Sequence, residues 1–406
     1  MINVIGLGYI GLPTALMLST HGNDVIGTDY NKDLISILKT GRTTFKEKGM
    51  DALFDKAVKA GINFSNDYKK TDIYIVTVPT PYDKITKKID PGYVISAINT
   101  ILDVCKKGAI IVIESTVSPG TIDKFIRPTI LNKGFVIGED VHLVHAPERI
   151  IPGNMIHELM YNNRTIGADD REIGEKIKKI YASFCKGQII VTDIKTAEMT
   201  KVVENTFRAV NIAFANELAK ICDYDGMDVY EIINICNMHP RVKILQPGPG
   251  VGGHCISVDP WFLVGDYPLL TNVILESMKV NNSMPSYVLD KVSKIAEKEG
   301  ITDYSRIGIY GLTYKENVDD VRDSPTLQLL EMQKANLATP LKVYDPWVER
   351  DIVDNQYHNF DSFLESVDFV IIMVKHSHIQ ENMHKLHGKI IYDTCNVSNI
   401  EGTYKL

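Results

Sequence analysis

The sequence contains no apolar run long enough to cross a lipid bilayer. Its longest runs, such as Phe369–Val374, have the length of a buried strand, whereas a bilayer-spanning helix needs about 20 apolar residues. The sequence also has no long block of like charges, and 44 Lys and Arg residues face 51 Asp and Glu residues, a formal net charge of −7. A nucleic acid or an anionic membrane would require a basic face, so we expect neither as a partner.

Cysteine is scarce and scattered. The six cysteines show neither a CxxC pair nor the spacing of metal ligands, so we expect free thiols in a reducing compartment and no metal site. The first residues, Met1–Ile5, follow a strand pattern and carry no basic segment, which predicts that a signal peptide is absent. The sequence therefore favours a cytoplasmic protein.

Short β-branched runs alternate with amphipathic stretches near both ends of the chain, which predicts an α/β fold with parallel sheets. The strands expected in the first part are Asn3–Ile5, Asp24–Thr28, Ile73–Val78, Ile110–Glu114 and Val141–His145. Those expected in the last part are Arg306–Tyr310, Leu341–Tyr344, Phe369–Val374 and Lys389–Tyr392. Between them, apolar residues recur every three to four positions from about Thr196 to Asp223, which predicts one long helix, and more helix is expected from about Asn272 to Glu299. We therefore expect a Rossmann-like domain over 1–190, a helical domain over 191–300 and a second Rossmann-like domain over 301–406.

Three glycines follow the first expected strand in the pattern Gly6-x-Gly8-x-x-Gly11. In a dinucleotide-binding turn the first glycine makes the tight turn, the second lets a pyrophosphate approach the backbone, and the third lets the helix pack on the strand. Asp29 ends the next strand, 18 residues after Gly11, where a carboxylate binds the ribose hydroxyls of NAD and repels the phosphate of NADP. Lys32 is a mild counter-signal, and a turn needed only for packing would explain the glycines alone. The combination of strand, helix and acid favours NAD as the cofactor.

A second feature is Cys255, which follows Gly252 and Gly253 in a loop rich in glycine and proline. An accessible thiol whose anion is stabilised nearby can attack a carbonyl carbon. Asp259 offers a carboxylate four residues later. Taken alone, a single cysteine is more often a small core residue, so its assignment as a nucleophile depends on the rest of the sequence.

Two further groups of polar residues carry potential chemistry. Lys201 and Asn205 lie one turn apart on the expected long helix and Arg208 follows one turn later, although a solvated helix face would explain them equally well. Glu148 follows the expected strand Val141–His145, and ligands of α/β proteins bind at the carboxyl ends of strands. An exposed loop acid is the alternative reading of Glu148.

Taken together and in order, these motifs resemble those of the UDP-sugar 6-dehydrogenases of the UDP-glucose/GDP-mannose dehydrogenase family. The motifs that carry the resemblance are Gly6–Gly11, Val78–Pro81, Glu114–Val117, Ala146–Arg149, Lys201 with Asn205, Gly252–Cys255 with Asp259, and Gly311–Lys315. Within the family, the chain is most similar to the UDP-N-acetylmannosamine dehydrogenases in three segments, His239–Arg241, Gln246–Cys255 and Asn162–Arg164. Arg149 and His254 stand where relatives that oxidise UDP-glucose usually carry a phenylalanine-type residue and a serine, and both departures point to an acetamido sugar.

The resemblance implies an NAD-binding first domain, a central helical domain that forms the dimer, and a C-terminal domain that holds UDP. It also implies a four-electron oxidation of the sugar C6 hydroxyl to a carboxylate, with two NAD and one water consumed per sugar. Cys255 would capture the intermediate aldehyde as a thiohemiacetal that is oxidised to a thioester, and Glu148 would activate the hydrolytic water. Lys201 and Asn205 would stabilise charge on the C6 oxygen. The first base would be Lys201 or Asp259, and the sequence does not decide between them.

The resemblance also implies binding contacts, carried over residue by residue. NAD contacts are expected at Gly6, Gly8, Tyr9, Ile10, Gly11, Asp29, Thr80, Thr116 and Arg322. Substrate contacts are expected at Arg149, Ile150, Lys201, Asn205, Arg208, His239, Arg241, Gly252, Tyr314 and Lys315. In relatives the loop around Arg241 reaches a neighbouring subunit, so we expect a homodimer or a dimer of dimers.

Several functions remain to be weighed against one another. UDP-N-acetyl-D-mannosamine is the expected substrate, for surface polysaccharide synthesis, and UDP-N-acetyl-D-glucosamine, which differs only in configuration at C2, is the alternative. A two-electron hydroxyacid dehydrogenase would give Cys255 no role. A non-catalytic sensor of NAD or a nucleotide sugar would be expected to have lost Lys201, Glu148 or Cys255, and all three are present.

Overall fold

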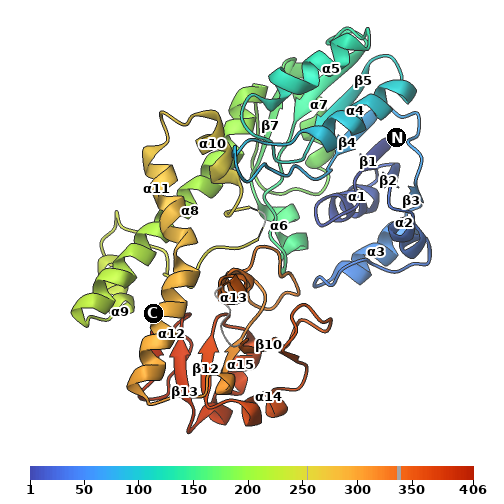
Figure 1. Ribbon diagram of the computed structural model, residues 1–406. Coiled ribbons are helices and arrows are strands. Elements are labelled where there is room, and N and C mark those ends of the chain that lie inside the picture. Colours follow the sequence, from blue (N-terminus) through green and yellow to red (C-terminus); the bar gives the residue numbers. More distant parts are fainter. Residues whose placement is uncertain (254, 336–339) are drawn as a thin grey trace. The chain divides into compact units, whose positions relative to one another are not determined.

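The computed structural model describes residues 1–253, 255–335 and 340–406, which form two compact units, 1–204 and 205–406 (Figure 1). Each unit is built on its own α/β sheet. The long helix expected between the two strand-rich regions is α8 (Ile194–Asp225). The predicted α/β class, with two Rossmann-like parts and a long helix between them in sequence, is therefore confirmed. The boundaries expected at 190 and 300 stay predictions.

The N-terminal unit contains an eight-stranded sheet in the order β3-β2-β1-β4-β5-β6-β7-β8. The strands are β1 (Ile2–Ile5), β2 (Val25–Thr28), β3 (Asn63–Ser65), β4 (Ile73–Val76), β5 (Ala109–Ile113), β6 (Val141–His145), β7 (Arg164–Ala168) and β8 (Ile189–Thr192). Neighbouring strands are parallel except for β6 and β7, which are antiparallel. The strand order reverses between β1 and β4, and such a switch point is where open α/β sheets bind their ligands.

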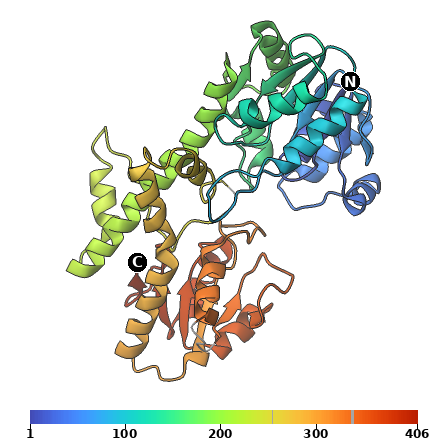
Figure 2. The same cartoon turned by 45° about the horizontal axis from the view of Figure 1, so that its top comes forward.

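Alternate residues of each central strand enter different cores, because successive side chains of a strand point to opposite faces. Ile75 of β4 and Val112 of β5 belong to one core, whereas Val76 and Ile111 belong to the other. Helices cover both faces of this sheet (Figures 1 and 2). Those on the first core are α1 (Gly11–Thr20), α2 (Lys32–Lys39), α3 (Met50–Lys59), α6 (Met155–Tyr161) and α7 (Arg171–Tyr181), and those on the second are α4 (Gly92–Val104) and α5 (Arg127–Asn132).

The C-terminal unit contains a six-stranded parallel sheet in the order β11-β10-β9-β12-β13-β14. The strands are β9 (Ile307–Tyr310), β10 (Lys342–Tyr344), β11 (Gln356–Tyr357), β12 (Phe369–Ile372), β13 (Ile390–Asp393) and β14 (Tyr404–Lys405). One face packs against helices that include α9 (Val229–Cys236), α12 (Met284–Lys298) and α13 (Pro325–Ala335). The other packs against α14 (Phe360–Ser366) and α15 (Ser377–Glu381).

The helical stretch expected from Asn272 to Glu299 is divided into α11 (Asn272–Asn282) and α12. Ser283 caps the end of α11, and Pro285 stands in the first turn of α12. A proline has no N–H to donate to the preceding turn and its ring clashes with that turn's carbonyl, so a helix is kinked or broken at this position.

Candidate functional site

The turn between β1 and α1 has the geometry that its three glycines predict. Gly6 adopts a φ of +89°, which L side chains rarely tolerate, and a Cβ on Gly11 would lie 1.8 Å from the Gly6 carbonyl oxygen. A Cβ on Gly8, by contrast, would meet no atom within 4 Å. The first turn of α1 carries no acidic residue. The open backbone at Gly8 and the positive end of the helix dipole therefore suit a pyrophosphate.

Asp29 lies beside this turn at the end of β2. Its carboxylate accepts hydrogen bonds from the backbone N–H of Leu7 at 2.8 Å and from that of Asn31 at 2.9 Å. These two bonds fix the carboxylate at the switch point of the sheet. Each carboxylate oxygen can accept a further hydrogen bond, so a ribose hydroxyl can still bind. The residues present thus fit NAD.

The other residues expected near NAD in this unit lie in loops close to the same turn. The hydroxyl of Thr80 donates a hydrogen bond to the carbonyl of Thr116 at 2.7 Å. The ring of Tyr9 packs on that of Phe45, with 4.4 Å between the ring centroids. Ile10 is the N-cap residue of α1. The loops after β4 and β5 are therefore held together at the carboxyl edge of the sheet.

Glu148 follows β6 and is not the exposed loop acid that the sequence left as an alternative. Its side chain is only 3% exposed. Oε1 accepts the backbone N–H of Arg149 at 2.6 Å, and Oε2 pairs with the guanidinium of Arg164. Ile150, expected near the substrate, places its side chain in the core of the unit.

Arg149 is held by the N-terminal unit itself. Its Nη1 donates to the carbonyl of Asn163 at 3.0 Å and its Nη2 to the hydroxyl of Thr165 at 2.9 Å. Its Nε lies 2.9 Å from a carboxylate oxygen of Glu204. The guanidinium is thus fixed in direction, with its charge partly balanced by an acid on α8.

The structure separates the three polar residues expected on one side of α8. Lys201 and Asn205 are buried, whereas Arg208 is exposed. A solvated helix face therefore explains Arg208 but not the other two. Asn205 donates from Nδ2 to Oδ2 of Asp259 at 2.6 Å. Asp259, which lies four residues after Cys255 in the sequence, therefore contacts Asn205 on α8.

The loop that carries Cys255 has its glycines packed against a tyrosine. A Cβ on Gly252 would lie 2.7 Å from the Cβ of Tyr314, and a Cβ on Gly253 would lie 2.8 Å from the Tyr314 ring. Gly253 also adopts a φ of +80° and donates its N–H to the Arg322 carbonyl at 2.9 Å. Gly252 is therefore required for space, and Gly253 for both space and backbone conformation.

Cys255 itself is exposed, and its thiol is not part of a disulfide. Its carbonyl accepts the backbone N–H of Asp259, the first residue of α10 (Asp259–Asp266), at 2.9 Å. His254, which the sequence used to favour an acetamido sugar, lies outside the described residues. The cysteine is therefore accessible, and it is fixed to the helix that begins with Asp259.

Tyr314 and Lys315 lie in the loop that follows β9. Two buried side chains fix this loop: the N–H of Asn317 donates to Nδ1 of His376 at 2.8 Å, and the N–H of Leu312 donates to Oδ2 of Asp345 at 2.6 Å. Further along, Arg322 makes two hydrogen bonds with the carboxylate of Asp320, at 2.8 and 2.6 Å.

His239 and Arg241 lie in an exposed loop after α9. The backbone N–H of Arg241 donates to Nδ1 of His239 at 3.3 Å. Both side chains are accessible to solvent, as the resemblance requires of residues that bind a substrate or reach another subunit.

Sequence reasoning did not predict the buried charged side chains of the N-terminal unit. Glu114 and Arg164 are almost fully buried in the N-terminal unit. Glu198 on α8 accepts the N–H groups of Gly120 at 2.6 Å and Ile122 at 2.9 Å, and burial raises its pKa to about 7. The available signal was Glu114, an acidic residue directly after an apolar run, which requires a buried partner.

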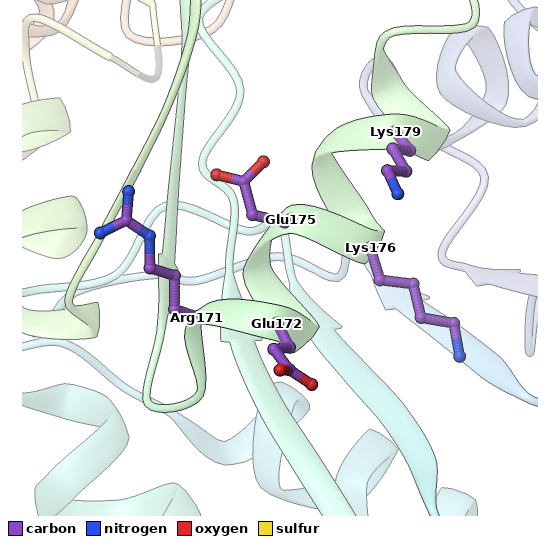
Figure 3. Close-up of a pocket in the computed structure, with 5 residues that line it drawn as sticks. All are labelled: Arg171, Glu172, Glu175, Lys176 and Lys179. Carbon is purple, nitrogen blue, oxygen red and sulfur yellow. The ribbon is translucent and has the colours of Figure 1, made fainter.

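A shallow depression on the outer side of α7 does not belong to the candidate site. It is lined by Arg171, Glu172, Glu175, Lys176 and Lys179. Figure 3 shows that these side chains point in different directions, and they carry both signs of charge.

Within 1–253, 255–335 and 340–406, no group of three or more His, Cys, Asp or Glu residues could hold a metal ion. None of the helices in the described part of the chain is long and apolar enough to span a bilayer.

The chain matches the UDP-glucose/GDP-mannose dehydrogenase family in three parts. These are its NAD binding domain over residues 1–185, its central domain over 195–283 and its UDP binding domain over 308–400. The chain is 41% identical to the UDP-N-acetyl-D-mannosamine dehydrogenase of Methanococcus maripaludis strain S2, over 97% of this chain and 92% of that protein. It is 38% identical to the NDP-N-acetyl-D-galactosaminuronic acid dehydrogenase of Ralstonia nicotianae, over 97% and 95%. The solved structure of the UDP-N-acetyl-mannosamine dehydrogenase Cap5O from Staphylococcus aureus is 40% identical, with a TM-score of 0.89 over 100% of this chain and 97% of that one.

Proposed function

We propose that this chain, which belongs to the UDP-glucose/GDP-mannose dehydrogenase family, oxidises C6 of UDP-N-acetyl-D-mannosamine to UDP-N-acetyl-D-mannosaminuronate. Membership of the family makes it an NAD-dependent UDP-sugar dehydrogenase. The choice of sugar is supported by the UDP-N-acetyl-D-mannosamine dehydrogenases among its relatives, which are 36–41% identical over nearly the whole chain. The four-electron chemistry is supported by one observation above others, the exposed Cys255 shortly after Gly252 and Gly253, where a Cβ would meet Tyr314.

The overall reaction converts the C6 alcohol, two NAD⁺ and one water into the carboxylate, two NADH and three protons. Bound NAD supplies the hydride acceptor for both oxidations, and the Gly6–Gly11 turn with Asp29 would hold it. In the first oxidation the C6 hydroxyl loses its proton to Lys201 or Asp259, both of which are buried. Burial excludes competing water and strengthens charge stabilisation by Lys201 and the Asn205 amide.

The second half of the reaction requires a covalent link to the enzyme. The Cys255 thiolate attacks the C6 aldehyde carbon, a C–S bond forms, and the carbonyl oxygen takes up a proton to give a thiohemiacetal. Loss of a hydride and a proton then gives the thioester. Glu148 removes a proton from water, which attacks the thioester carbon and releases the thiol and the carboxylate.

We infer that the chain forms a homodimer or a dimer of dimers through α8. Three large apolar residues on this helix, Phe207, Phe214 and Ile221, follow one another at intervals of seven and are at least half exposed. Residues spaced by seven lie on one stripe of a helix, as in a coiled-coil seam. An exposed apolar stripe of this kind marks an association surface.

The reaction product would be an acidic amino-sugar nucleotide, which supports a role in surface polysaccharide synthesis. The proposal is tested by mixing the protein with excess NAD and a limiting amount of UDP-N-acetylmannosamine, UDP-N-acetylglucosamine or UDP-N-acetylgalactosamine. Two NADH formed per UDP-N-acetylmannosamine, with the other two sugars at least tenfold slower in kcat/KM, is the expected result. One NADH per sugar would refute the four-electron scheme, and preference for another epimer would refute the substrate.

A further inference from the structure

A buried cluster of charges lies against Glu148 in the N-terminal unit. Arg164 is 4% exposed and contacts two carboxylates that come from neighbouring strands. Its Nη1 lies 3.2 Å from Oε1 of Glu114, the residue after β5, and its Nη2 pairs with Oε2 of Glu148, in the loop after β6. Arg164 is itself the first residue of β7, so the ends of three neighbouring strands meet at one guanidinium.

Both oxygens of Glu148 are engaged in this arrangement. Oε2 is held by Arg164 and Oε1 by the N–H of Arg149, so the carboxylate is fixed in rotation. The guanidinium is fixed in turn, because it lies over the ring of Tyr181 at 4.4 Å and near that of Phe184 at 5.5 Å. A buried carboxylate stays ionised only beside a compensating charge.

Glu114 and Glu148 both contact the guanidinium of Arg164. Burial raises the pKa of Glu114 to about 8, against the opposing effect of Arg164. Each of the two carboxyl groups holds a different Nη atom of the Arg164 guanidinium. The carboxyl group of Glu114 then serves to hold the other side of the guanidinium.

We propose that Arg164 is a positioning residue for the hydrolytic half of the reaction, which holds the Glu148 carboxylate in a fixed orientation while Glu114 anchors the guanidinium. This inference rests on the proposed function, in which Glu148 activates water. In that step the water oxygen bonds to C6, the C6–S bond breaks, and Glu148 takes one water proton and passes it to the departing thiolate. The new carboxylic acid releases its proton to solvent, and no electrons are exchanged.

An arginine is suited to this role and a lysine is not. The two carboxylates are bound by two different Nη atoms of one planar group. A lysine ammonium is a single point charge on a flexible stem, so it would preserve the charge but not the two fixed directions. Arg164→Lys therefore separates the presence of a cation from its geometry.

The test follows NADH release in a stopped-flow instrument and the mass of the protein in quenched samples. We compare Arg164→Lys, Glu114→Gln, Glu148→Gln and Arg127→Lys with wild type, using UDP-N-acetylmannosamine and NAD. Arg127 is the matched control, since it makes two bonds of 2.7 Å to the carboxylate of Asp169 in the same unit. Arg127→Lys should behave as wild type in both measurements.

For Arg164→Lys we expect an unchanged first phase of two NADH per site, a steady-state rate at least tenfold lower, and an acyl adduct on Cys255. Hydroxylamine, which cleaves a thioester without an enzymic base, should restore at least half of the lost turnover. Glu114→Gln should show the same pattern with a smaller loss, and it keeps the proposal testable if Arg164→Lys does not fold. A slowed first phase without an adduct in the folded variants would overturn the proposal.

Glu148→Gln distinguishes this inference from the function on which it rests. An adduct in Glu148→Gln but in neither Arg164→Lys nor Glu114→Gln would overturn the positioning role and leave the base role of Glu148 intact. No adduct in any of the three variants would remove that base role, and the inference would fail with it.

Discussion

The side-chain amide of Asn205 donates a hydrogen bond to the carboxylate of Asp259 over 2.6 Å, and this contact joins α8 to the first residue of α10. The backbone N–H of Asp259 in turn donates to the carbonyl of Cys255 at 2.9 Å. These contacts link the amide, the carboxylate and the loop of the thiol in one hydrogen-bonded chain. An amide fixed in this way retains a second N–H, and a preoriented donor of this type is what a developing oxyanion requires.

We expect Cys255→Ser to lower kcat by a factor on the order of 10³ or more, because a nucleophile is lost. Binding of the UDP-sugar should change by less than about twofold, since the thiol acts only after the aldehyde has formed. Calorimetric titration with the UDP-sugar and a coupled assay measure the two quantities. Loss of binding together with turnover would make the role of Cys255 structural.

Asp29→Asn should weaken NAD about tenfold, since a hydrogen bond to a charged group contributes about 1.5–3 kcal/mol. Affinity for NADP should fall less, because removal of the negative charge relieves repulsion of the 2′-phosphate. The dissociation constants of both cofactors are measured by quenching of protein fluorescence. An unchanged ratio between them would contradict the ribose assignment.

The glycines of the Cys255 loop offer a matched pair of substitutions. In Gly252→Ala the new Cβ would lie 2.6 Å from the Asp323 carbonyl oxygen and 2.7 Å from the Cβ of Tyr314. We expect a loss of about 1–3 kcal/mol in the free energy of unfolding, as in an overpacked core, or a displaced loop with at least tenfold lower kcat. Urea denaturation and steady-state assays measure both.

Gly248→Ala is the control for this pair, because it lies in the same loop and a Cβ there would meet no atom within 4 Å. Its stability and kcat should match wild type. Equal effects of the two alanines would show that the loop responds to backbone stiffening and not to the contact with Tyr314.

His145, at the end of β6, should make the free energy of unfolding fall at acid pH. Complete burial lowers the pKa of this histidine to about 4, and its Nδ1 donates to the Ile113 carbonyl at 2.9 Å. Between pH 6.5 and about 4 the unfolded chain binds a proton that the folded chain does not, so stability falls as the pH falls through this window. The shift corresponds to at most about 3 kcal/mol.

His145→Gln should remove most of this pH dependence, measured as the difference in unfolding free energy between pH 7 and pH 4.5. His142→Gln is the control, since it changes a partly exposed histidine of the same strand. A wild-type acid slope in His145→Gln would show that other groups cause the loss of stability.

The stripe on α8 should be required for self-association. Phe214 is 51% exposed, and a glutamate in its place would bring a charge to each copy of a symmetric seam. We expect Phe214→Glu to shift the protein toward monomer by light scattering at micromolar concentration. Val58→Glu on α3, where the valine is 49% exposed, should leave the oligomer unchanged. A Phe214→Glu variant that keeps the wild-type mass would contradict the proposed dimer surface.

The cores and the glycine turn were predictable because their signals are local. Short β-branched runs located β4, β5, β6 and β12 to within one or two residues. The strands β3, β7, β8, β11 and β14 were not predicted. Only two or three residues define β3, β11 and β14, β7 begins with a charged arginine, and β8 is largely not buried. A strand of this kind is stabilised by its neighbours in the sheet rather than by its own sequence.

The amino-acid sequence by itself determined the α/β class and the choice of NAD, and it predicted catalytic roles for Cys255, Lys201 and Glu148. Residue types and short spacings carry that information. Only the tertiary structure decided which charges are buried together. The pairing of Arg164 with Glu114 and Glu148 joins positions 16 to 50 residues apart. Such a pairing depends on which strands lie side by side, and a spacing along one chain does not specify that neighbourhood.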